Sequence, residues 1–202
     1  MRVSDQVRCV DFPCLDTSRE AYLIPDVDVD PEKVSVIMIS EAAPEARDDH
    51  YYAGGDPLFA RTTVQAFNDA GSNASSINDI LELGVYLTTA VKCGKTTYAV
   101  APYTVSVCSL ILEQELALFP KTKTLLLMGD VAIRALNSIA RRAGEPRVIP
   151  AVSTYKLRGQ CFTFRGMRVF PSYLQAGPSF FIEKSKRRMI SEDIAAALRF
   201  VG

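Results

Sequence analysis

The sequence has no apolar run long enough to cross a membrane, no net charge and only one histidine among its 202 residues. Its longest apolar stretches have the length of strands, which argues against a membrane-spanning helix. Residues 1–5 open no apolar segment, so we expect no secretory signal peptide. We find no internal repeat, low-complexity tract or second domain. We therefore expect a protein of the cytoplasm, where thiols remain reduced.

What is present is the composition of a soluble globular protein, with 48% hydrophobic and 23% charged residues. A length of 202 residues suits one domain of ordinary size, so we predict a single, monomeric domain over residues 1–202. Residues 1–33 are acidic, contain proline and precede the first clear element of secondary structure. We expect them to form an extended lead-in that carries two cysteines.

The zero net charge hides an asymmetry along the chain. Residues 141–202 carry 12 Lys and Arg against 4 Asp and Glu, whereas residues 1–140 carry 11 against 19. A surface with a basic bias of this kind suits the phosphates of a nucleic acid. The same charges equally suit solvated helix and loop faces, so the asymmetry permits nucleic-acid binding without establishing it.

Strand-like apolar runs alternate with helix-like segments along the chain. Alternation of this kind predicts an α/β fold, here a three-layer α/β/α sandwich with a central, mainly parallel four-stranded sheet. Ligands of such sheets bind at the carboxyl ends of the strands. The predicted strands are residues 34–39, 85–91, 124–128 and 167–170, the last with a pairing strand at 161–164, and the predicted helices are 62–70, 75–84, 104–119, 131–140 and 186–200.

Four of the five cysteines form two local pairs, Cys9 with Cys14 and Cys93 with Cys108. Two such pairs can converge on one set of four thiolates, as a structural zinc or an iron–sulfur cluster requires. The alternative is that they are buried thiols, because free cysteine is among the most buried residue types. Disulfides are less expected in a chain that can bury its own core and shows no secretory segment. Cys161 is expected in a strand or the core.

Short motifs follow each predicted strand, and their order and spacing resemble the uracil-DNA glycosylase superfamily, specifically its iron–sulfur-containing bacterial and archaeal branches. The resemblance spans nearly the whole chain, although no single motif matches in full. The motifs that carry it are Ser40-Glu41-Ala42-Ala43-Pro44, Pro57-Leu58-Phe59, Tyr86-Leu87-Thr88-Thr89-Ala90-Val91-Lys92-Cys93, Met128-Gly129-Asp130-Val131-Ala132 and Phe170-Pro171-Ser172-Tyr173.

The resemblance implies a DNA glycosylase-like hydrolase of base-excision repair. Such an enzyme flips uracil or another deaminated or damaged base out of DNA and hydrolyses its N-glycosidic bond. The resemblance also implies a [4Fe–4S] cluster that braces a DNA-facing loop between Cys93 and Cys108, with zinc as the less expected occupant. Its ligands would be Cys9, Cys14, Cys93 and Cys108.

Two departures from the family pattern bear on activity. Thr89 stands where the family has an asparagine that binds the uracil edge, and a hydroxyl does not reproduce the paired geometry of an amide. Leu174-Gln175 stands where the family has a histidine that stabilises the charge on the departing base. The two N-terminal cysteines are also separated by four residues instead of two. A second hypothesis is therefore a nucleic-acid- or nucleotide-binding protein of the same fold without catalysis, and a third is a structural iron–sulfur or zinc protein unrelated to DNA.

Candidate site residues follow from the same motifs. Glu41 is expected to orient or activate water, and Asp49 and His50, with Asp48, to replace the missing histidine. The alternatives are that Glu41 caps a loop and that residues 48–50 form a solvated polar loop. Ser40, Ala42, Phe59 and Thr89 are candidates for base binding, with Phe59 stacking on the base or lying in the core. Leu174 as a wedge, Gln175, Lys184, Lys186 and Arg187 are candidates for contact with DNA.

Overall fold

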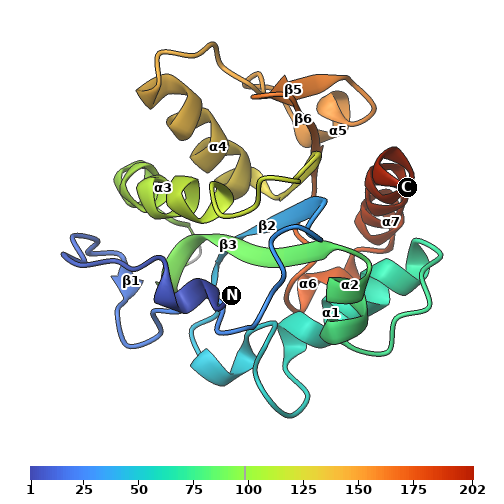
Figure 1. Cartoon of the computed structure of the whole chain (residues 1–202), viewed down its shortest axis with the longest axis horizontal. Helices are drawn as coiled ribbons and strands as arrows, with labels where there is room; N and C mark the ends of the chain where they lie inside the picture. The colour runs from blue at the N-terminus through green and yellow to red at the C-terminus, as the bar shows by residue number, and fades with distance from the viewer. Residues whose placement is uncertain (98) are drawn as a thin grey trace.

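A computed structural model describes residues 1–97 and 99–202, and its centre is a six-stranded sheet in the order β1-β3-β2-β4-β6-β5 (Figure 1). The four inner strands pair in parallel, and the two edge strands pair antiparallel to their neighbours. The strands are β1 (Thr17–Ser18), β2 (Val36–Ala43), β3 (Val85–Lys95), β4 (Thr124–Met128), β5 (Phe162–Phe164) and β6 (Met167–Ser172).

Helices cover both faces of the sheet (Figure 1). Helices α3 and α4 pack on one face, and α1, α2 and α7 pack on the other, each side with its own apolar core. The α-helices are α1 (Leu58–Asp69), α2 (Ile77–Glu82), α3 (Pro102–Leu116), α4 (Asp130–Arg142), α5 (Thr154–Leu157), α6 (Ser179–Ile182) and α7 (Lys184–Val201), and two short 3₁₀ helices are η1 (Val3–Asp5) and η2 (Arg47–Asp49).

The predicted three-layer α/β architecture is confirmed, but the sheet has six strands where the sequence predicts four. The expected pairing strand is present as β5, which returns to β6 through a turn with Arg165 at φ 48° and Gly166 at φ 83°. The lead-in supplies β1, a two-residue strand on the end of β3. Strand β2 also runs four residues beyond its predicted end, because polar Ser40 and Glu41 continue the ladder. Strands this short, or this polar at one end, carry no hydrophobic pattern that identifies them.

The inner strands are buried on both faces, as expected for parallel strands covered by helices. Residues 36–39 of β2 and 125–128 of β4 are at most 1% exposed. Alternate residues of each strand point to opposite faces, so neighbouring positions at the strand ends belong to different sides of the molecule. No helix in the described part of the chain combines the length and apolar character needed to cross a membrane.

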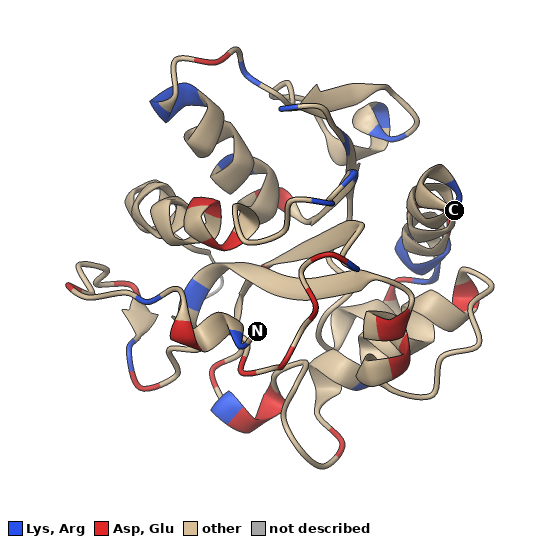
Figure 2. Cartoon of the chain, viewed as in Figure 1, with Lys and Arg blue, Asp and Glu red and all other residues tan. Residues whose placement is uncertain are grey.

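Part of the basic bias of residues 141–202 is offset by ion pairs with carboxylates. Figure 2 shows basic residues at the end of α4, around β6 and at the start of α7. Many of their side chains form ion pairs with acidic residues from both parts of the chain. These pairs are Arg142 with Glu113, Arg158 with Asp193 and Glu192, Arg165 with Glu113 and Glu145, and Arg187 with Asp69.

Candidate functional site

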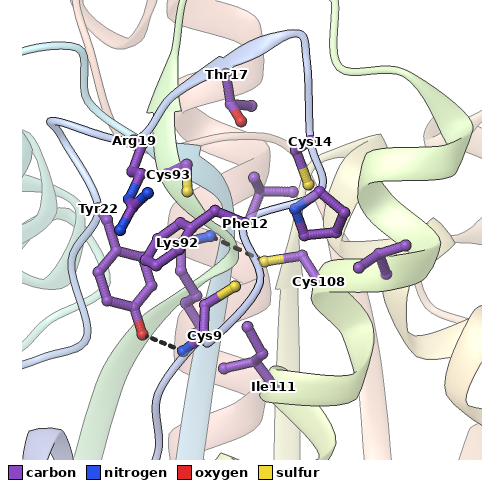
Figure 3. Close-up of a pocket in the computed structure, with 13 residues that line it drawn as sticks. Cys9, Phe12, Cys14, Thr17, Arg19, Tyr22, Lys92, Cys93, Cys108 and Ile111 are labelled. Carbon is purple, nitrogen blue, oxygen red and sulfur yellow. Dashed lines mark hydrogen bonds between the residues drawn. The ribbon is translucent and has the colours of Figure 1, made fainter.

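The four paired cysteines all line one pocket, which we call the cysteine pocket (Figure 3). Cys9 and Cys14 come from the lead-in, Cys93 from β3 and Cys108 from α3. The expected loop between Cys93 and Cys108 includes residue 98, which lies outside the described residues. Cys161 is exposed at the start of β5, far from a core position. The structure therefore brings together the four thiols that the sequence groups and leaves the fifth apart.

Hydrogen bonds to α3 and β3 hold the lead-in in place. The Asp16 carboxylate accepts from the backbone N–H of Ala101, the N-cap residue of α3, at 2.7 Å and from the hydroxyl of Thr104 in its first turn. Although desolvation alone would raise it, these hydrogen bonds lower the pKa of Asp16. The Leu23 N–H donates to the Lys92 carbonyl of β3 at 2.8 Å. The Cys9 backbone N–H donates to the Tyr22 hydroxyl at 2.7 Å. The two lead-in cysteines are thus positioned by contacts on either side of the pocket.

The cysteine pocket has the donor set of a thiolate site, and the thiols of Cys93 and Cys108 are protonated when free. Burial, with the neighbouring cysteines, raises the pKa of Cys93 to about 11 and that of Cys108 to about 12. The Lys92 backbone N–H donates to Cys108 Sγ at 3.2 Å, and Arg19 favours the thiolate of Cys93. Among the described residues, no three Cys, His, Asp or Glu side chains are already arranged to hold a metal ion. Ligand binding would therefore have to displace protons from these thiols.

A buried ion pair links α3 to β3 next to the cysteine pocket. The side chains of Lys92 and Glu115 are fully buried and contact each other. Lys92 Nζ also donates to Thr88 Oγ1 at 2.7 Å and to the Thr89 carbonyl at 2.5 Å. The Tyr86 hydroxyl donates to Glu115 at 2.6 Å. A buried charge of this kind is tolerated only when its partners are complete, and here they are.

On the opposite face, hydrogen bonds join the side chains of Ser40, Tyr51, Thr63 and Gln175. With the adjacent buried residues His50, whose ring lies 5.0 Å from that of Tyr51, and Thr89, the register partner of Ser40, they form what we call the polar cluster. Each residue is at most 1% exposed. Ser40 and Thr89 are register partners in the middle of β2 and β3, one position after the last β2–β4 pair and level with the end of β4. Thr63 comes from α1, and Gln175 comes from the segment after β6.

Hydrogen bonds run through the polar cluster in one direction. Gln175 Nε2 donates to the Tyr51 hydroxyl at 3.1 Å and to Thr63 Oγ1 at 3.3 Å. Tyr51 shares a hydrogen bond with Ser40, and the Ser40 hydroxyl donates to the Thr88 carbonyl at 3.2 Å. Because Ser40 donates to that carbonyl, Tyr51 donates to Ser40 and accepts from Gln175. The relay therefore starts at an amide and ends on the backbone of β3.

The polar cluster is uncharged at neutral pH. Burial and the nearby charge of Lys92 lower the pKa of His50 to about 3, so its imidazole is neutral. Burial raises the pKa of Tyr51 to about 12, so its phenol keeps its proton. His50 Nε2 and Gln175 Oε1 are both buried and have no hydrogen-bond partner in the structure. Unpaired buried polar atoms of this kind are rare, and they suit a neutral polar ligand or a bound water.

Segments flanking the polar cluster fix its geometry. The Tyr52 hydroxyl bonds both the N–H and the carbonyl of Leu87, which holds residues 50–52 against the open edge of β3. After β6, the Ser172 hydroxyl donates to Asp193 of α7 at 2.5 Å, and Arg158 bonds the same carboxylate. These contacts anchor the chain on both sides before it enters the cluster.

The two carboxylates predicted to be catalytic lie at helix N-termini, outside the polar cluster. Glu41 points to the opposite face from Ser40, and its Oε1 lies 3.5 Å from the Val131 N–H in the first turn of α4. A Cβ on Gly129 would lie 2.5 Å from that oxygen, and this glycine has a φ of 102°. Asp49 accepts from the Leu58 N–H, at the start of α1. A helix N-terminus stabilises a negative charge, so both positions have a structural reason for their carboxylate.

The remaining predicted base-binding residues divide between the two faces. The half-buried Phe59 ring lies 5.4 Å from the Tyr51 ring, beside the polar cluster. Ala42 is buried in the core under α3 and α4. Of the predicted base-binding residues, the polar cluster therefore contains Ser40 and Thr89, with Phe59 at its edge.

The predicted DNA contacts are only partly at the surface. Gln175 is fully buried, so any contact with DNA would be with a base that enters the polar cluster, and Leu174 is half-buried against the α1 and α7 core. Lys184 is exposed. Lys186 pairs with Glu183 at 2.6 Å, and Arg187 pairs with Asp69.

Sequence reasoning missed Tyr51, Thr63 and Glu115 as contributors to these sites. Glu115 carries a weak signal, since it is an acidic residue in the apolar helical run that ends at Leu116. Tyr51 adjoins the predicted His50. Thr63 gives no signal, because its role depends on which face of α1 meets the sheet.

The comparison with known families agrees with this fold. The model of the Uracil DNA glycosylase superfamily matches residues 27–192. The chain belongs to this superfamily. The matched range contains Cys93, Cys108 and the polar cluster, and it begins after Cys9 and Cys14. A search of curated proteins found no match to the chain.

Proposed function

We propose that the protein is a DNA glycosylase-like hydrolase that removes uracil or another deaminated or damaged base from DNA in base-excision repair. Superfamily membership supports a glycosylase-like function in general. The observation that carries the proposal for this chain is the polar cluster, whose strand residues Ser40 and Thr89 lie level with the carboxyl end of β4. In α/β sheets, ligands bind toward the carboxyl ends of the strands. The polar cluster is neutral and buried, and two of its polar atoms have no partner. A flipped base needs a site of this character.

The polar cluster suits stabilisation of the departing base. In the reaction the bond from C1′ to the base nitrogen breaks, the bonding electrons leave with the base, and water adds to C1′ with loss of a proton. The neutral imidazole of His50 and the Thr89 hydroxyl are groups able to donate hydrogen bonds to a base oxygen as its charge grows. Phe59 would stack on the flipped ring. No hydrogen bond of the cluster involves a carboxylate in the described part of the chain, so the proposal places the main effect on the leaving group.

We further propose that the cysteine pocket holds a [4Fe–4S] cluster, with zinc as the alternative. Four thiols from three segments face one pocket, and four cysteine thiolates are the usual ligands of such a cluster. The bound group would tie the lead-in to β3 and α3 and would take no part in base release. DNA would be the partner, approached through Lys184 and its neighbours, and we expect a cytoplasmic monomer.

A base-release assay tests the proposed function. Protein purified without oxygen is incubated with duplexes that carry one uracil, hypoxanthine or xanthine, and with duplexes that carry the parent bases. Abasic sites are then cleaved with alkali and counted. We expect cleavage at one or more of the deaminated bases and none at cytosine, adenine or guanine. If none of the three deaminated bases is released, the proposed glycosylase activity on these bases is wrong.

The alternative function is a binding protein of the same fold. The position of Glu41 and Asp49 at helix N-termini favours it, because neither carboxylate faces the polar cluster. Selective binding of a deaminated base without its release would support this alternative.

A further inference from the structure

The side-chain amide of Gln175 lies inside the polar cluster, where its nitrogen forms hydrogen bonds and its oxygen forms none. Both N–H groups face acceptors, the Tyr51 and Thr63 hydroxyls, with Met38 Sδ also 3.3 Å from Nε2. The carbonyl oxygen, Oε1, has no partner although the residue is fully buried. Leaving a buried acceptor unpaired costs about 1–3 kcal/mol. A ligand that donates a hydrogen bond to this oxygen would remove that cost.

The hydrogen-bond relay keeps this oxygen free. Ser40 is committed to donating to the Thr88 carbonyl, so Tyr51 must donate to Ser40 and accept from Gln175. Reversing the amide would place its oxygen beside Tyr51, whose proton is already used, and would take both amide N–H groups away from the acceptors they now face. The unpaired atom of Gln175 is therefore held as a hydrogen-bond acceptor, and it needs a donor from the ligand.

An acceptor at this point distinguishes deaminated bases from their parents. Cytosine has a bare ring nitrogen at N3 and adenine has one at N1, and both are acceptors. Deamination gives uracil and hypoxanthine, in which the same ring positions carry N–H donors. An acceptor in the site therefore accepts a hydrogen bond from the ring N–H of uracil or hypoxanthine. Beside cytosine or adenine the same acceptor faces the lone pair of the ring nitrogen, and no hydrogen bond forms.

We propose that Gln175 is a base-reading residue, whose Oε1 accepts the ring N–H of a flipped, deaminated base. The inference rests on the proposed function and names the group that selects the substrate class. His50 Nε2, the second unpartnered atom, is available for a further polar atom of the same ligand. Thymine carries the same ring N–H as uracil, so Gln175 discriminates uracil from cytosine but not from thymine.

The base must enter through the segment that closes the polar cluster. Tyr51 contributes to the cluster and also borders a cavity of about 500 Å³ between α1, α2 and the lead-in. Residues 51–53 and 55–57 line this cavity, and they include Gly55 with a φ of 85° and nothing within 4 Å of an added Cβ. Outward movement of this segment would open the cluster and would break the two hydrogen bonds between the Tyr52 hydroxyl and Leu87 of β3.

The test compares Gln175→Leu, which removes the amide and keeps much of the volume, with Gln160→Leu at an exposed position. Single-turnover base release and equilibrium binding are measured on duplexes with one uracil, hypoxanthine, cytosine or thymine. Gln175→Leu is expected to lower release of uracil and hypoxanthine about tenfold or more and to lose the binding preference for uracil over cytosine. The preference for uracil over thymine stays unchanged, and Gln160→Leu behaves as the unmodified protein.

The possible outcomes separate this inference from the proposed function. If the unmodified protein releases bases and Gln175→Leu does so equally well, the base-reading role is wrong and the proposed enzymatic function is supported. If the protein releases no base but prefers uracil to cytosine, and Gln175→Leu loses that preference, the base-reading role is supported and the proposed enzymatic function is wrong. If the protein neither releases nor discriminates, both are wrong. Thermal unfolding monitors the fold, and Gln175→Met replaces Gln175→Leu should the latter fail to fold.

Discussion

The cysteine pocket and the polar cluster share strand β3, but they lie on opposite faces of the sheet and differ in chemistry. The cysteine pocket gathers four thiols and adjoins the buried charges of Lys92 and Glu115. The polar cluster holds hydroxyl groups, one amide and a neutral imidazole, with two polar atoms left unpaired. In the cysteine pocket, hydrogen bonds tie separate segments of the chain together. In the polar cluster, His50 Nε2 and Gln175 Oε1 have no hydrogen-bond partner. This difference underlies the two proposals, bracing by the cysteine pocket and ligand recognition by the polar cluster.

Loss of a cysteine should have the largest effect, because the proposed cluster needs all four thiolates. Protein purified without oxygen is expected to be brown and to contain iron, and Cys93→Ser is expected to be colourless and nearly iron-free. Cys161→Ser, at an exposed position outside the pocket, is the matched control and should keep its iron. Visible absorption and elemental analysis provide the measurement. A parent protein without iron or zinc would show that the four cysteines are ordinary buried thiols, and the proposed bracing role of the cysteine pocket would be wrong.

Breaking the buried ion pair should be the next largest effect. Lys92→Met leaves the Glu115 carboxylate buried without its partner, which typically costs about 3–5 kcal/mol. Adding Glu115→Gln removes the unpaired charge and leaves an acceptor for Tyr86, so the double variant should regain part of the loss. The free energy of unfolding in urea is the measurement. Equal stability of Lys92→Met and the parent would show that this face does not depend on the pair.

His50 should give the polar cluster its own pH dependence. Its pKa is about 3 in the folded protein and about 6.5 in an unfolded chain, so unfolding takes up a proton between these values. The stability is complete above pH 6.5 and falls as the pH drops, by up to about 1.4 kcal/mol per pH unit. His50→Gln, which does not titrate, should flatten the curve between pH 6.5 and pH 5. If both proteins have the same slope in this window, the imidazole is not buried as described.

Removing the contact that anchors the lead-in should have the smallest effect. Asp16→Ala takes away the acceptor of the Ala101 N–H and the Thr104 hydroxyl, and the loss of such a cap costs about 0.5–2 kcal/mol. We expect faster release of iron to a chelator and little change in base release. A large loss of base release with iron retained would mean that the lead-in does more than brace the cysteine pocket.

The two regions also differ in how far the sequence predicts them. The cysteine pairs are local in sequence, and their convergence needs only that the lead-in crosses the end of β3. The positions of Glu41 and Asp49 in the motifs predict a catalytic role for both carboxylates. In the structure, Glu41 instead faces the N-terminus of α4, because side chains alternate along β2, and Asp49 accepts a hydrogen bond at the N-terminus of α1. Thr63 and Gln175 enter the polar cluster through the packing of α1 and of the segment after β6. Packing of this kind depends on tertiary contacts that no single stretch of sequence encodes.

A crystal structure with bound DNA would test the central claim most directly. The duplex would carry one 2′-fluoro-2′-deoxyuridine, whose glycosidic bond resists hydrolysis. The account predicts a flipped uracil beside Phe59, with its ring N–H nitrogen about 2.7–3.2 Å from Gln175 Oε1. A uracil that stays stacked in the duplex, or that binds away from the polar cluster, would contradict it.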